Sequence, residues 1–261
     1  MFKINEAVVQ IKHFPDGTLR LNITSASDMA RLEWYYEKGE EMLLLFIVRH
    51  LREKFAVKSL VLYMPYIPYA RMDRVKTEKE VFTLKYFCGF VNSLRFDKVI
   101  VRDAHSNVSL ALLDNVVSEP VEGNLKRLII ELLYPQEDIV FYPDEGSYKR
   151  YSEKLDFPSA FGVKKRDWET GDILGLELHG QVPAHPFKAM IIDDISSYGG
   201  TFFNSAKKLK ELGADKIYLY VTHCENSILQ GELIHSGLLE KIYTTKSIFT
   251  GEHPLVEVIG G

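Results

Sequence analysis

Two adjacent carboxylates, Asp193 and Asp194, stand where an apolar run gives way to a short turn. The turn consists of small or hydroxylated residues around one tyrosine: Ser196, Ser197, Tyr198, Gly199, Gly200 and Thr201. Ligands of parallel sheets bind beyond the carboxyl ends of strands, glycines let a ligand approach the backbone, and the start of the helix expected next favours a phosphate. Because carboxylates repel phosphate, this pair should bind sugar hydroxyls or Mg²⁺. The segment therefore predicts a site for a phosphorylated ribose.

The elements that must position this site alternate between short apolar strands and amphipathic helices, which predicts an α/β fold with parallel sheets. After a hairpin with arms Ala7–His13 and Thr18–Thr24, strands are expected at Ser59–Met64, Lys98–Arg102, Asp138–Tyr142, Ala160–Lys164, Ala189–Ile192 and Lys216–Thr222. Helices are expected at Glu40–Phe55, Thr83–Leu94, Asn124–Leu133, Ser147–Leu155 and Phe203–Leu212. The count of elements predicts two domains, residues 1–137 and 138–261. The polar residues 166–187 are expected to form a hairpin or loop that can act as a lid.

Composition excludes several classes of function. The 32 Lys and Arg residues against 36 Asp and Glu residues give a net charge of −4, so no general basic field attracts nucleic acid or a membrane surface. The longest apolar run, Met42–Val48, is too short to cross a bilayer. The N-terminus lacks a secretion signal, which favours a cytoplasmic location. Cys88 and Cys224 lack metal-type spacing and are expected to be small packed side chains.

Further motifs occur in order along the chain. They are Phe14-Pro15-Asp16-Gly17, the Pro-Tyr-rich segment Pro65 to Arg74, Asp103-Ala104-His105, Asp114-Asn115, Pro143-Asp144-Glu145-Gly146 with Lys149-Arg150, Lys164-x-Arg166, Thr222-His223, and Thr245 to Ile248. Together with the turn after Asp194, this ordered set resembles the ribose-phosphate pyrophosphokinase (phosphoribosyl pyrophosphate synthetase) family. The chain is similar to a short and divergent member of that family over residues 14 to about 248.

The resemblance implies two phosphoribosyltransferase-like domains, each a mainly parallel sheet flanked by helices. The first would carry the ATP side and the second the ribose-phosphate turn, with the last residues able to pack back on the first domain. The implied reaction is Mg²⁺-dependent transfer of the diphosphoryl group of ATP to the anomeric hydroxyl of ribose 5-phosphate. Its products would be 5-phosphoribosyl 1-diphosphate and AMP.

The resemblance also implies residue roles. Lys164 and Arg166 would be catalytic, because their charge can stabilise the transferring phosphates. ATP would be bound by Phe14, Asp16, Arg71, Met72, Asp73, Arg74 and His105. Mg²⁺ would be held by His105 and Asp144, with Asp103 and Asp114 as second candidates. The partners implied are ATP and a 5-phosphoribosyl acceptor, in a homo-oligomer whose Phe14–Gly17 hairpin completes the ATP site of an adjacent subunit.

Four positions depart from the family pattern. Met72 replaces a glutamine that contacts ATP, and Thr18 replaces a glutamate after the hairpin turn. Ser197-Tyr198 replaces Asp-Thr in the phosphate turn. Losing that acid makes the pocket less repulsive to added negative charge, and the tyrosine adds an aromatic face. The interpretation is an acceptor that carries more on its 5-phosphate, such as ADP-ribose.

Other hypotheses about the function stay open. A phosphoribosyltransferase would share the ribose-phosphate turn, but the ordered Arg71–Arg74, His105 and Asp144 set argues against it. A non-catalytic sensor or associated subunit would keep the fold and bind nucleotide or sugar phosphate, yet Lys164 and His105 are both present. A general nucleotide-binding domain is disfavoured, because neither the Gly-x-x-x-x-Gly-Lys nor the Gly-x-Gly-x-x-Gly fingerprint occurs.

Overall fold

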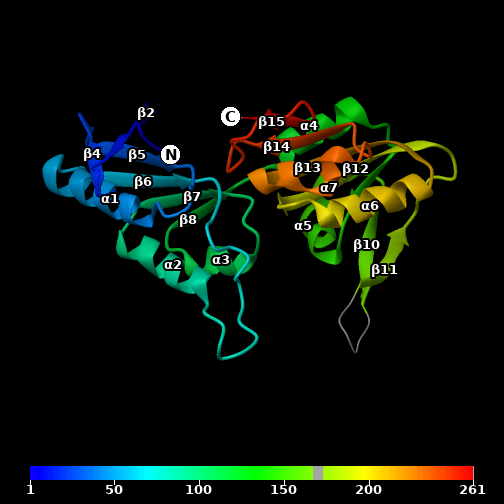
Figure 1. Ribbon diagram of the computed structural model, residues 1–261, viewed down its shortest axis with the longest axis horizontal. Helices are drawn as coiled ribbons and strands as arrows, with labels where there is room; N and C mark the ends of the chain where they lie inside the picture. Colours follow the sequence, from blue (N-terminus) through cyan, green and yellow to red (C-terminus); the bar gives the residue numbers. More distant parts are fainter. Residues whose placement is uncertain (167–172, 261) are drawn as a thin grey trace. The chain divides into compact units, whose positions relative to one another are not determined.

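The computed structural model describes residues 1–166 and 173–260, and the side chains of residues 164–176 lie outside that description. The chain divides into two compact units, Met1–Pro120 and Val121–Gly261 (Figure 1). Each unit contains a mainly parallel sheet flanked by helices, which confirms the α/β class. The division falls before helix α4 (Glu122–Leu132) instead of before residue 138, because the apolar face of α4 packs into the core of the second unit.

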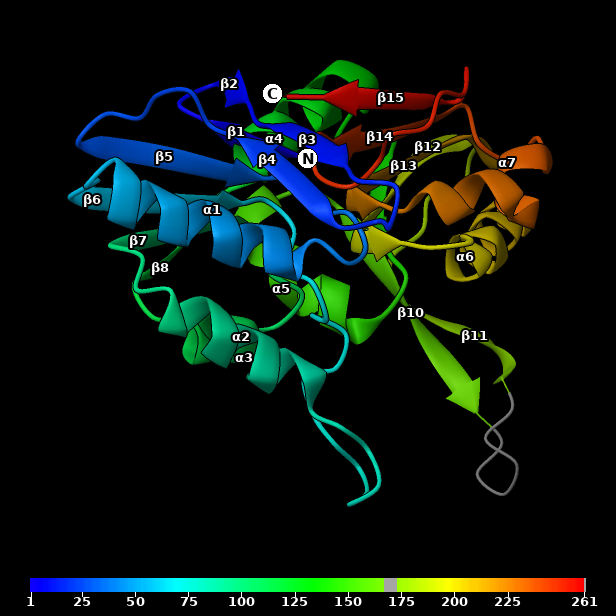
Figure 2. The ribbon, with the colours of Figure 1, turned by 60° about the vertical axis from the view of Figure 1, so that its left-hand side comes forward.

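The first unit is built on a six-stranded sheet in the order β2-β1-β5-β6-β7-β8. Four strands are parallel and follow one another in sequence: β5 (Met29–Trp34), β6 (Ser59–Met64), β7 (Lys98–Arg102) and β8 (Val116–Glu119). The crossover helices are α1 (Glu41–Lys54), α2 (Thr83–Ser93) and α3 (Asn107–Leu112). Right-handed crossovers that always step in one direction place their helices on one face. These three helices accordingly lie on the same side of the sheet (Figure 2).

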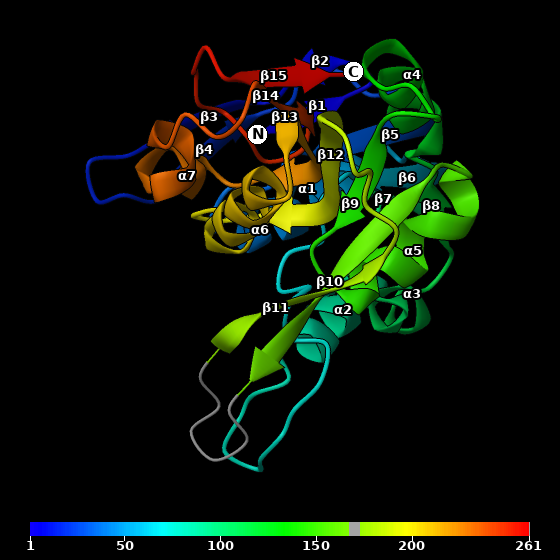
Figure 3. The same ribbon diagram turned by 90° about the vertical axis from the view of Figure 1, so that its right-hand side faces the viewer.

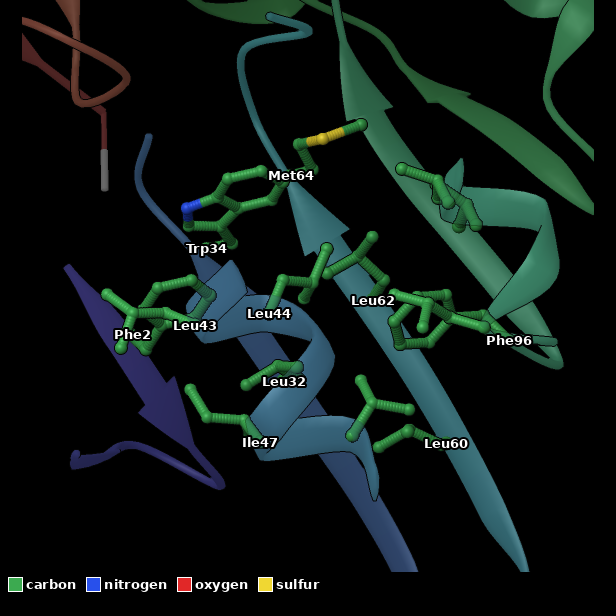
Figure 4. Close-up of a cluster of buried hydrophobic side chains, with 14 of the residues drawn as sticks. Phe2, Leu32, Trp34, Leu43, Leu44, Ile47, Leu60, Leu62, Met64 and Phe96 are labelled. Atoms are coloured by element: carbon green, nitrogen blue, oxygen red, sulfur yellow. The ribbon is translucent and has the colours of Figure 1, made fainter. Parts of the chain in front are cut away.

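The core of the first unit lies between this sheet and its helices. Leu44 and Ile47 of α1 are fully buried with Leu32 of β5 and Leu62 of β6 (Figure 4). Their spacing follows the helical period on α1 and the two-residue period on the strands, so each element contributes one apolar face. Trp34 caps this core and donates its indole N–H to the Glu40 carboxylate at 2.9 Å.

The second unit contains a seven-stranded sheet in the order β11-β10-β9-β12-β13-β14-β15. The strands run as follows: β9 (Ile139–Tyr142), β10 (Ser159–Arg166), β11 (Ile173–Gly180), β12 (Phe187–Ser196), β13 (Ala214–Cys224), β14 (Lys241–Thr245) and β15 (Val256–Ile259). All neighbouring pairs are parallel except β10 with β11, which are antiparallel. A hairpin or loop was expected within residues 166–187, whereas the observed hairpin uses β10 from Ala160 to Arg166 as its first arm. From β9 the chain continues to β10 on one side, whereas from β12 it continues to β13 on the other, so the strand order reverses between β9 and β12.

Helices cover both faces of this second sheet (Figure 3). Val140 and Met190 point to the face covered by α4 and α5 (Glu145–Leu155), whereas their neighbours Ile139 and Ile191 belong to the opposite face. That opposite face is covered by α6 (Gly200–Glu211) and α7 (Glu232–His235). Burial on both faces explains why these strands are continuous apolar runs in the sequence.

Several expected boundaries are corrected by the structure. The start of the expected first arm is a separate strand, β2 (Ala7–Val8), which pairs with β1 (Phe2–Ile4). The hairpin therefore consists only of β3 (Gln10–His13) and β4 (Leu19–Asn22). Strand β12 continues through both aspartates to Ser196, because it pairs with β13 along its whole length. Helix α6 begins at Gly200 and not at Phe203.

Both cysteines are buried free thiols, as expected from their spacing. Burial raises the pKa of Cys88 to about 11 and that of Cys224 to about 12, the latter with a contribution from the charge of Glu225. Among the residues that the structure describes, no helix is long and apolar enough to cross a membrane.

Candidate active site

The strongest candidate site lies at the reversal of strand order in the second unit. In the row β10-β9-β12-β13-β14, the connection from β9 leads to one side and the connection from β12 leads to the other. Such a switch point leaves a crevice at the carboxyl ends of the two central strands, where open α/β sheets bind their ligands. Asp144 lies shortly after β9, and Asp193 and Asp194 lie near the carboxyl end of β12. The fold therefore brings these three predicted residues together.

Asp194 is almost completely buried, with 4% of its surface exposed. Its carboxylate is held by Arg150 of α5, whose Nη1 lies 3.3 Å from Asp194 Oδ2. The Asp194 backbone N–H also donates to Asp193 Oδ1 at 2.9 Å. A buried carboxylate needs this kind of partner, since an unpaired buried charge is costly. Asp194 is thus fixed in place before any ligand arrives.

Asp193 experiences a different environment. Burial raises the pKa of its carboxyl group well above the ordinary carboxyl value, and the charges of Asp194 and Asp144 raise it further. A donor hydroxyl or a cation beside Asp193 would counteract each of these effects. This environment fits a ligand that brings sugar hydroxyls or a divalent cation.

The turn after the aspartates contains two glycines with different structural requirements. Gly199 caps α6 with a φ of +83°, and a Cβ there would lie 2.9 Å from Leu233, so both backbone and packing demand glycine. Gly200 is helical, and its Cβ would meet nothing within 4 Å. The fold itself gives no reason for glycine at 200. A phosphate approaching the N-terminus of α6 would provide one.

The remaining turn residues surround this backbone. Ser196 is buried at the end of β12, Thr201 is half-buried in the first turn of α6, and Tyr198 is 59% exposed. Ser197 donates its hydroxyl to Glu225 Oε2 at 2.9 Å. Glu225 was not predicted from the sequence to be a site residue. Its position directly after β13, the strand beside β12, is the signal that could have identified it.

Asp144 has a structural role that the sequence did not reveal. It is the N-cap of α5, and its Oδ1 accepts a hydrogen bond from the Ser147 N–H at 3.0 Å. In return, the Asp144 N–H donates to the Ser147 hydroxyl oxygen at 3.4 Å. This reciprocal arrangement explains an aspartate at that position without a ligand. Its electrostatic effect on Asp193 nevertheless places its charge at the switch point.

The two residues predicted to be catalytic lie on the β10–β11 hairpin. Phe161 pairs with Tyr142 of β9, so Lys164 and Arg166 continue the strand past the end of β9, at the edge of the sheet where Asp144 stands. The backbone of Lys164 pairs with Leu176 across the hairpin. The side chains of Lys164 and Arg166 lie outside the described residues.

Buried hydroxyls fix the neighbouring strand ends. The carbonyl oxygen of Thr222 in β13 accepts hydrogen bonds from Thr244 at 3.3 Å, Thr245 at 2.9 Å and Ser247 at 3.2 Å. All four residues are buried, and His223 is buried beside them. The closing motifs of the sequence are therefore joined at the carboxyl edge of the sheet that carries Asp193.

In the first unit, two predicted ATP-binding segments lie at one edge of the sheet. The segment Pro65–Arg74 follows β6, and Asp103-Ala104-His105 follows its parallel neighbour β7. The Arg102 N–H donates to the Pro65 carbonyl at 3.3 Å, which joins the starts of both loops. Tyr69 and Asp103 have left-handed backbones, with φ of 64° and 43°. Such strained positions of non-glycine residues often occur at functional sites.

The side chains of these two loops differ in their exposure to solvent. Arg71 and Arg74 are exposed, and Arg74 Nε lies 3.3 Å from Asp73 Oδ1. Met72 is half-buried and donates its backbone N–H to the Tyr69 carbonyl at 2.9 Å. His105 is half-buried, and Asp103 is buried. The exposed charged side chains here are the cationic Arg71 and Arg74, which suit a polyphosphate.

The structure does not bring Asp114 together with the other predicted metal ligands. After His105, helix α3 returns along the sheet, and Asp114 and Asn115 precede the parallel strand β8. The Val99 N–H donates to the Asn115 carbonyl at 3.0 Å, at the start of β7. Asp114 therefore stands at the edge of the sheet opposite to Asp103 and His105.

The predicted ATP-binding hairpin forms with an exposed tip. Phe14 is 48% exposed. Asp16 accepts hydrogen bonds from the Thr18 hydroxyl at 2.7 Å and the Thr18 N–H at 2.9 Å, which lower the pKa of Asp16. Thr18 thus holds the Asp16 carboxylate within the turn, and a glutamate at this position would keep the backbone donor but lose the hydroxyl donor.

No cage for a metal ion is preformed in the described part of the chain, where no three His, Cys, Asp or Glu side chains are placed to bind one together. Mg²⁺ is often held by one or two carboxylates, with substrate phosphates and waters completing the octahedron. Asp144 and Asp193 fit that arrangement in the second unit, and Asp103 and His105 fit it in the first.

Known proteins resemble the chain in sequence and in fold. No protein-family model matches it. The chloroplastic ribose-phosphate pyrophosphokinase 2 of Oryza sativa subsp. japonica is 27% identical, over 94% of this chain and 63% of its own length. The ribose-phosphate pyrophosphokinase of Thermosipho africanus is 28% identical over 80% of this chain and 67% of its own length. That of Thermococcus kodakarensis is 29% identical over 82% and 77%. The chain thus spans less than two thirds of the rice protein.

A solved structure extends this similarity to the whole fold. The phosphoribosylpyrophosphate synthetase of Mycobacterium smegmatis superposes with a TM-score of 0.79 over 97% of this chain and 85% of its own, at 19% identity. The expected pair of phosphoribosyltransferase-like domains is therefore confirmed. In sequence the chain is thus similar to ribose-phosphate pyrophosphokinases, and in fold it is similar to a phosphoribosylpyrophosphate synthetase.

Proposed function

We propose that the chain transfers the diphosphoryl group of ATP to the anomeric hydroxyl of a 5-phosphoribosyl acceptor, with ribose 5-phosphate as the first candidate. The observation that carries this proposal is the switch point of the second unit, where Asp193 and Asp194 precede a glycine turn and a helix N-terminus. Carboxylates that accept hydroxyls beside a backbone that binds phosphate match the two ends of a ribose 5-phosphate.

In the proposed reaction, the anomeric oxygen forms a bond to the β-phosphorus of ATP. The bond from that phosphorus to the oxygen bridging the α and β phosphates breaks, and AMP leaves with that oxygen. The proton of the anomeric hydroxyl goes to water. Such a transfer depends on positioning and on stabilising charge rather than on a protein nucleophile. Lys164 and Arg166 are assigned to stabilise the charge of the transferring phosphates.

Mg²⁺ is the proposed cofactor. It would neutralise phosphate charge and orient the triphosphate when bound. The first ligands to consider are Asp144 in the second unit and His105 in the first, with Asp103 as a further candidate. Asp193 is added because burial, and then the charges of Asp194 and Asp144, raise its pKa, and a cation would offset these effects. Asp114 is left out of this assignment because of its position at the other edge of its sheet.

The nucleotide is assigned to the first unit. Arg71 and Arg74 would bind the phosphates of ATP, and Asp73 would orient Arg74. Phe14, Asp16 and Met72 complete the proposed ATP-binding set. Because the Phe14 tip is exposed, we assign the tip to the ATP site of a second copy of the chain, so that the working enzyme is a homo-oligomer.

A larger acceptor, such as ADP-ribose, is the second candidate. The exposed ring of Tyr198 favours it, because an aromatic face beside a phosphate turn can stack on a group attached to that phosphate. The loss of acid at Ser197 no longer supports it, since the Glu225 carboxylate occupies the same neighbourhood.

The test offers ribose 5-phosphate and ADP-ribose separately with Mg-ATP and follows AMP release, with product masses as the second measurement. AMP formed in step with a diphosphorylated acceptor supports the proposal and identifies the acceptor. Turnover of ribose 5-phosphate alone rejects the larger acceptor. A phosphoribosyltransferase would instead consume 5-phosphoribosyl 1-diphosphate with a base, and a sensor would bind nucleotide or sugar phosphate without releasing AMP. Either result would contradict the proposal.

A further inference from the structure

We propose that Glu225 supplies the phosphate turn with the carboxylate that position 197 lacks, and that Ser197 holds it there. This inference rests on the proposed function, because it assigns a positioning residue to the acceptor site. It identifies one acid outside the motif that sets the affinity of the turn for a 5-phosphoribosyl acceptor.

The sheet places Glu225 beside the turn. Strands β12 and β13 are parallel neighbours, and Ser196 is in register with Cys224. One residue further along, the Glu225 N–H donates to the Ser196 carbonyl at 2.8 Å. The backbones of the turn and of Glu225 are therefore joined directly, at the carboxyl edge where ligands bind.

Two serine hydroxyls then fix the carboxylate. Ser197 and Ser227 donate to the same oxygen, Oε2, at 2.9 Å and 3.1 Å. Glu225 is also the N-cap residue of a short 3-10 helix, η1 (Asn226–Gln230), but its side chain makes no capping hydrogen bond to that helix. Helix capping therefore does not account for the orientation of this acid.

The residue at 197 and the acid at 225 depend on each other. A hydroxyl at 197 can donate to the carboxylate, whereas an aspartate at 197 would place two negative charges within hydrogen-bond distance. The serine in the turn is thus matched to an acid on the adjacent strand. Through Ser197, Glu225 fixes the start of the turn and gives the acceptor site a negative charge suited to sugar hydroxyls.

The test separates charge from shape. Glu225→Gln keeps the size and one acceptor oxygen but removes the charge, and it is expected to raise the KM for ribose 5-phosphate about 10-fold. The KM for ATP and the melting temperature should change little. Glu232→Gln, an exposed carboxylate of α7 in the same unit, is the control and should change neither KM. Should ADP-ribose prove to be the acceptor, its KM replaces that of ribose 5-phosphate.

Moving the carboxylate from position 225 to position 197 gives the decisive comparison. Ser197→Asp alone places two carboxylates together and should also raise the acceptor KM about 10-fold. Ser197→Asp combined with Glu225→Gln returns one charge to the turn and should recover a KM within about threefold of the unmodified chain. An additive loss in the double variant, or an unchanged acceptor KM in Glu225→Gln, overturns the inference while leaving acceptor turnover intact. Absence of turnover in the unmodified chain would contradict the proposed function itself.

Discussion

The two candidate binding regions are built in different ways. In the second unit, Asp194 and Ser196 are 4% and 1% exposed, and their surroundings are fixed by Arg150 and by strand pairing. In the first unit, the Arg74 side chain is 81% exposed and Phe14 lies on an open hairpin tip. Buried polar groups need partners in the free protein, whereas exposed ones do not. The candidate ribose region is therefore preorganised, and substitutions of its buried polar side chains should affect stability together with binding.

The largest effect is expected for Lys164 on the β10–β11 hairpin, and it tests whether this hairpin acts in the chemical step and not in substrate binding. Lys164→Ala should lower kcat by roughly 10²–10³, because a lost charge no longer stabilises the transferring phosphates. The KM for the acceptor and the melting temperature should stay close to their original values. Steady-state AMP release and thermal unfolding provide the measurements. Unchanged turnover would remove Lys164 from the mechanism.

The ion pair of Arg150 with Asp194 tests the preorganisation of the ribose region. Arg150→Met should destabilise the protein by about 3 kcal/mol, since it leaves a buried carboxylate unpaired. Adding Asp194→Asn should recover part of that loss, because the stranded charge is then absent. Denaturant unfolding of both variants measures this. Equal stability of Arg150→Met and the unmodified chain would mean that the pair does not fix the site.

Gly200 separates ligand binding from folding within the same turn. Gly200→Ala should leave stability equal or up to about 1 kcal/mol higher, because the position is helical and open. The acceptor KM should rise about 10-fold or more if a phosphate must approach this backbone. Gly123→Ala in α4 has the same open surroundings and is the matched control. An unchanged acceptor KM in Gly200→Ala would place the phosphate elsewhere.

Arg74 tests the opposite expectation for the nucleotide region. Arg74→Ala should raise the KM for ATP roughly 3- to 10-fold through a lost contact to phosphate. Unfolding free energy should stay within about 0.5 kcal/mol, as expected for an exposed side chain. Arg49→Ala, on the exposed face of α1, serves as the control and should leave both quantities unchanged. A large loss of stability in Arg74→Ala would contradict the contrast between the two regions.

The smallest effect concerns the pH dependence of Asp193. Its pKa is raised in the folded chain above the ordinary value of 3.8, mainly by burial. The native state then keeps a proton that the unfolded chain releases, so this carboxyl lowers stability as pH rises above 3.8. Asp193→Asn should melt a few degrees higher than the unmodified chain at pH 7, and the two should converge near pH 4. A lower melting temperature at pH 7 would show that the Asp193 charge is compensated.

Sequence patterns predicted strands well where an uninterrupted apolar run forms their centre. Ser59–Met64 and Lys98–Arg102 form strands with the expected bounds. Strand β5 was missed because it is not a continuous apolar run. Its buried Ala30 and Leu32 alternate with exposed Met29 and Arg31, as in a half-buried strand. The short edge strand β8 was missed for a similar reason, since only part of it is buried.

Residue order alone predicted the candidate site only where its residues are close in the chain, and Asp144 entered through the family resemblance. The turn after Asp194 is one continuous segment, so its chemistry could be read from residue order. Glu225 and Asp114 could not be assigned in that way, because strand pairing brings the first to the turn and a returning helix carries the second away from His105. Such positions are decided by tertiary structure.

A single-turnover experiment can follow the β-phosphate of ATP from substrate to product. The protein is mixed with ATP carrying a label in its β-phosphate, Mg²⁺ and an acceptor, in a single turnover with enzyme in excess, and the label is followed by mass spectrometry. The proposal predicts that all transferred label lies in an acceptor with a diphosphate on its anomeric carbon, with one AMP formed for each. Label found in ADP or free phosphate, or AMP formed equally without acceptor, would contradict the account.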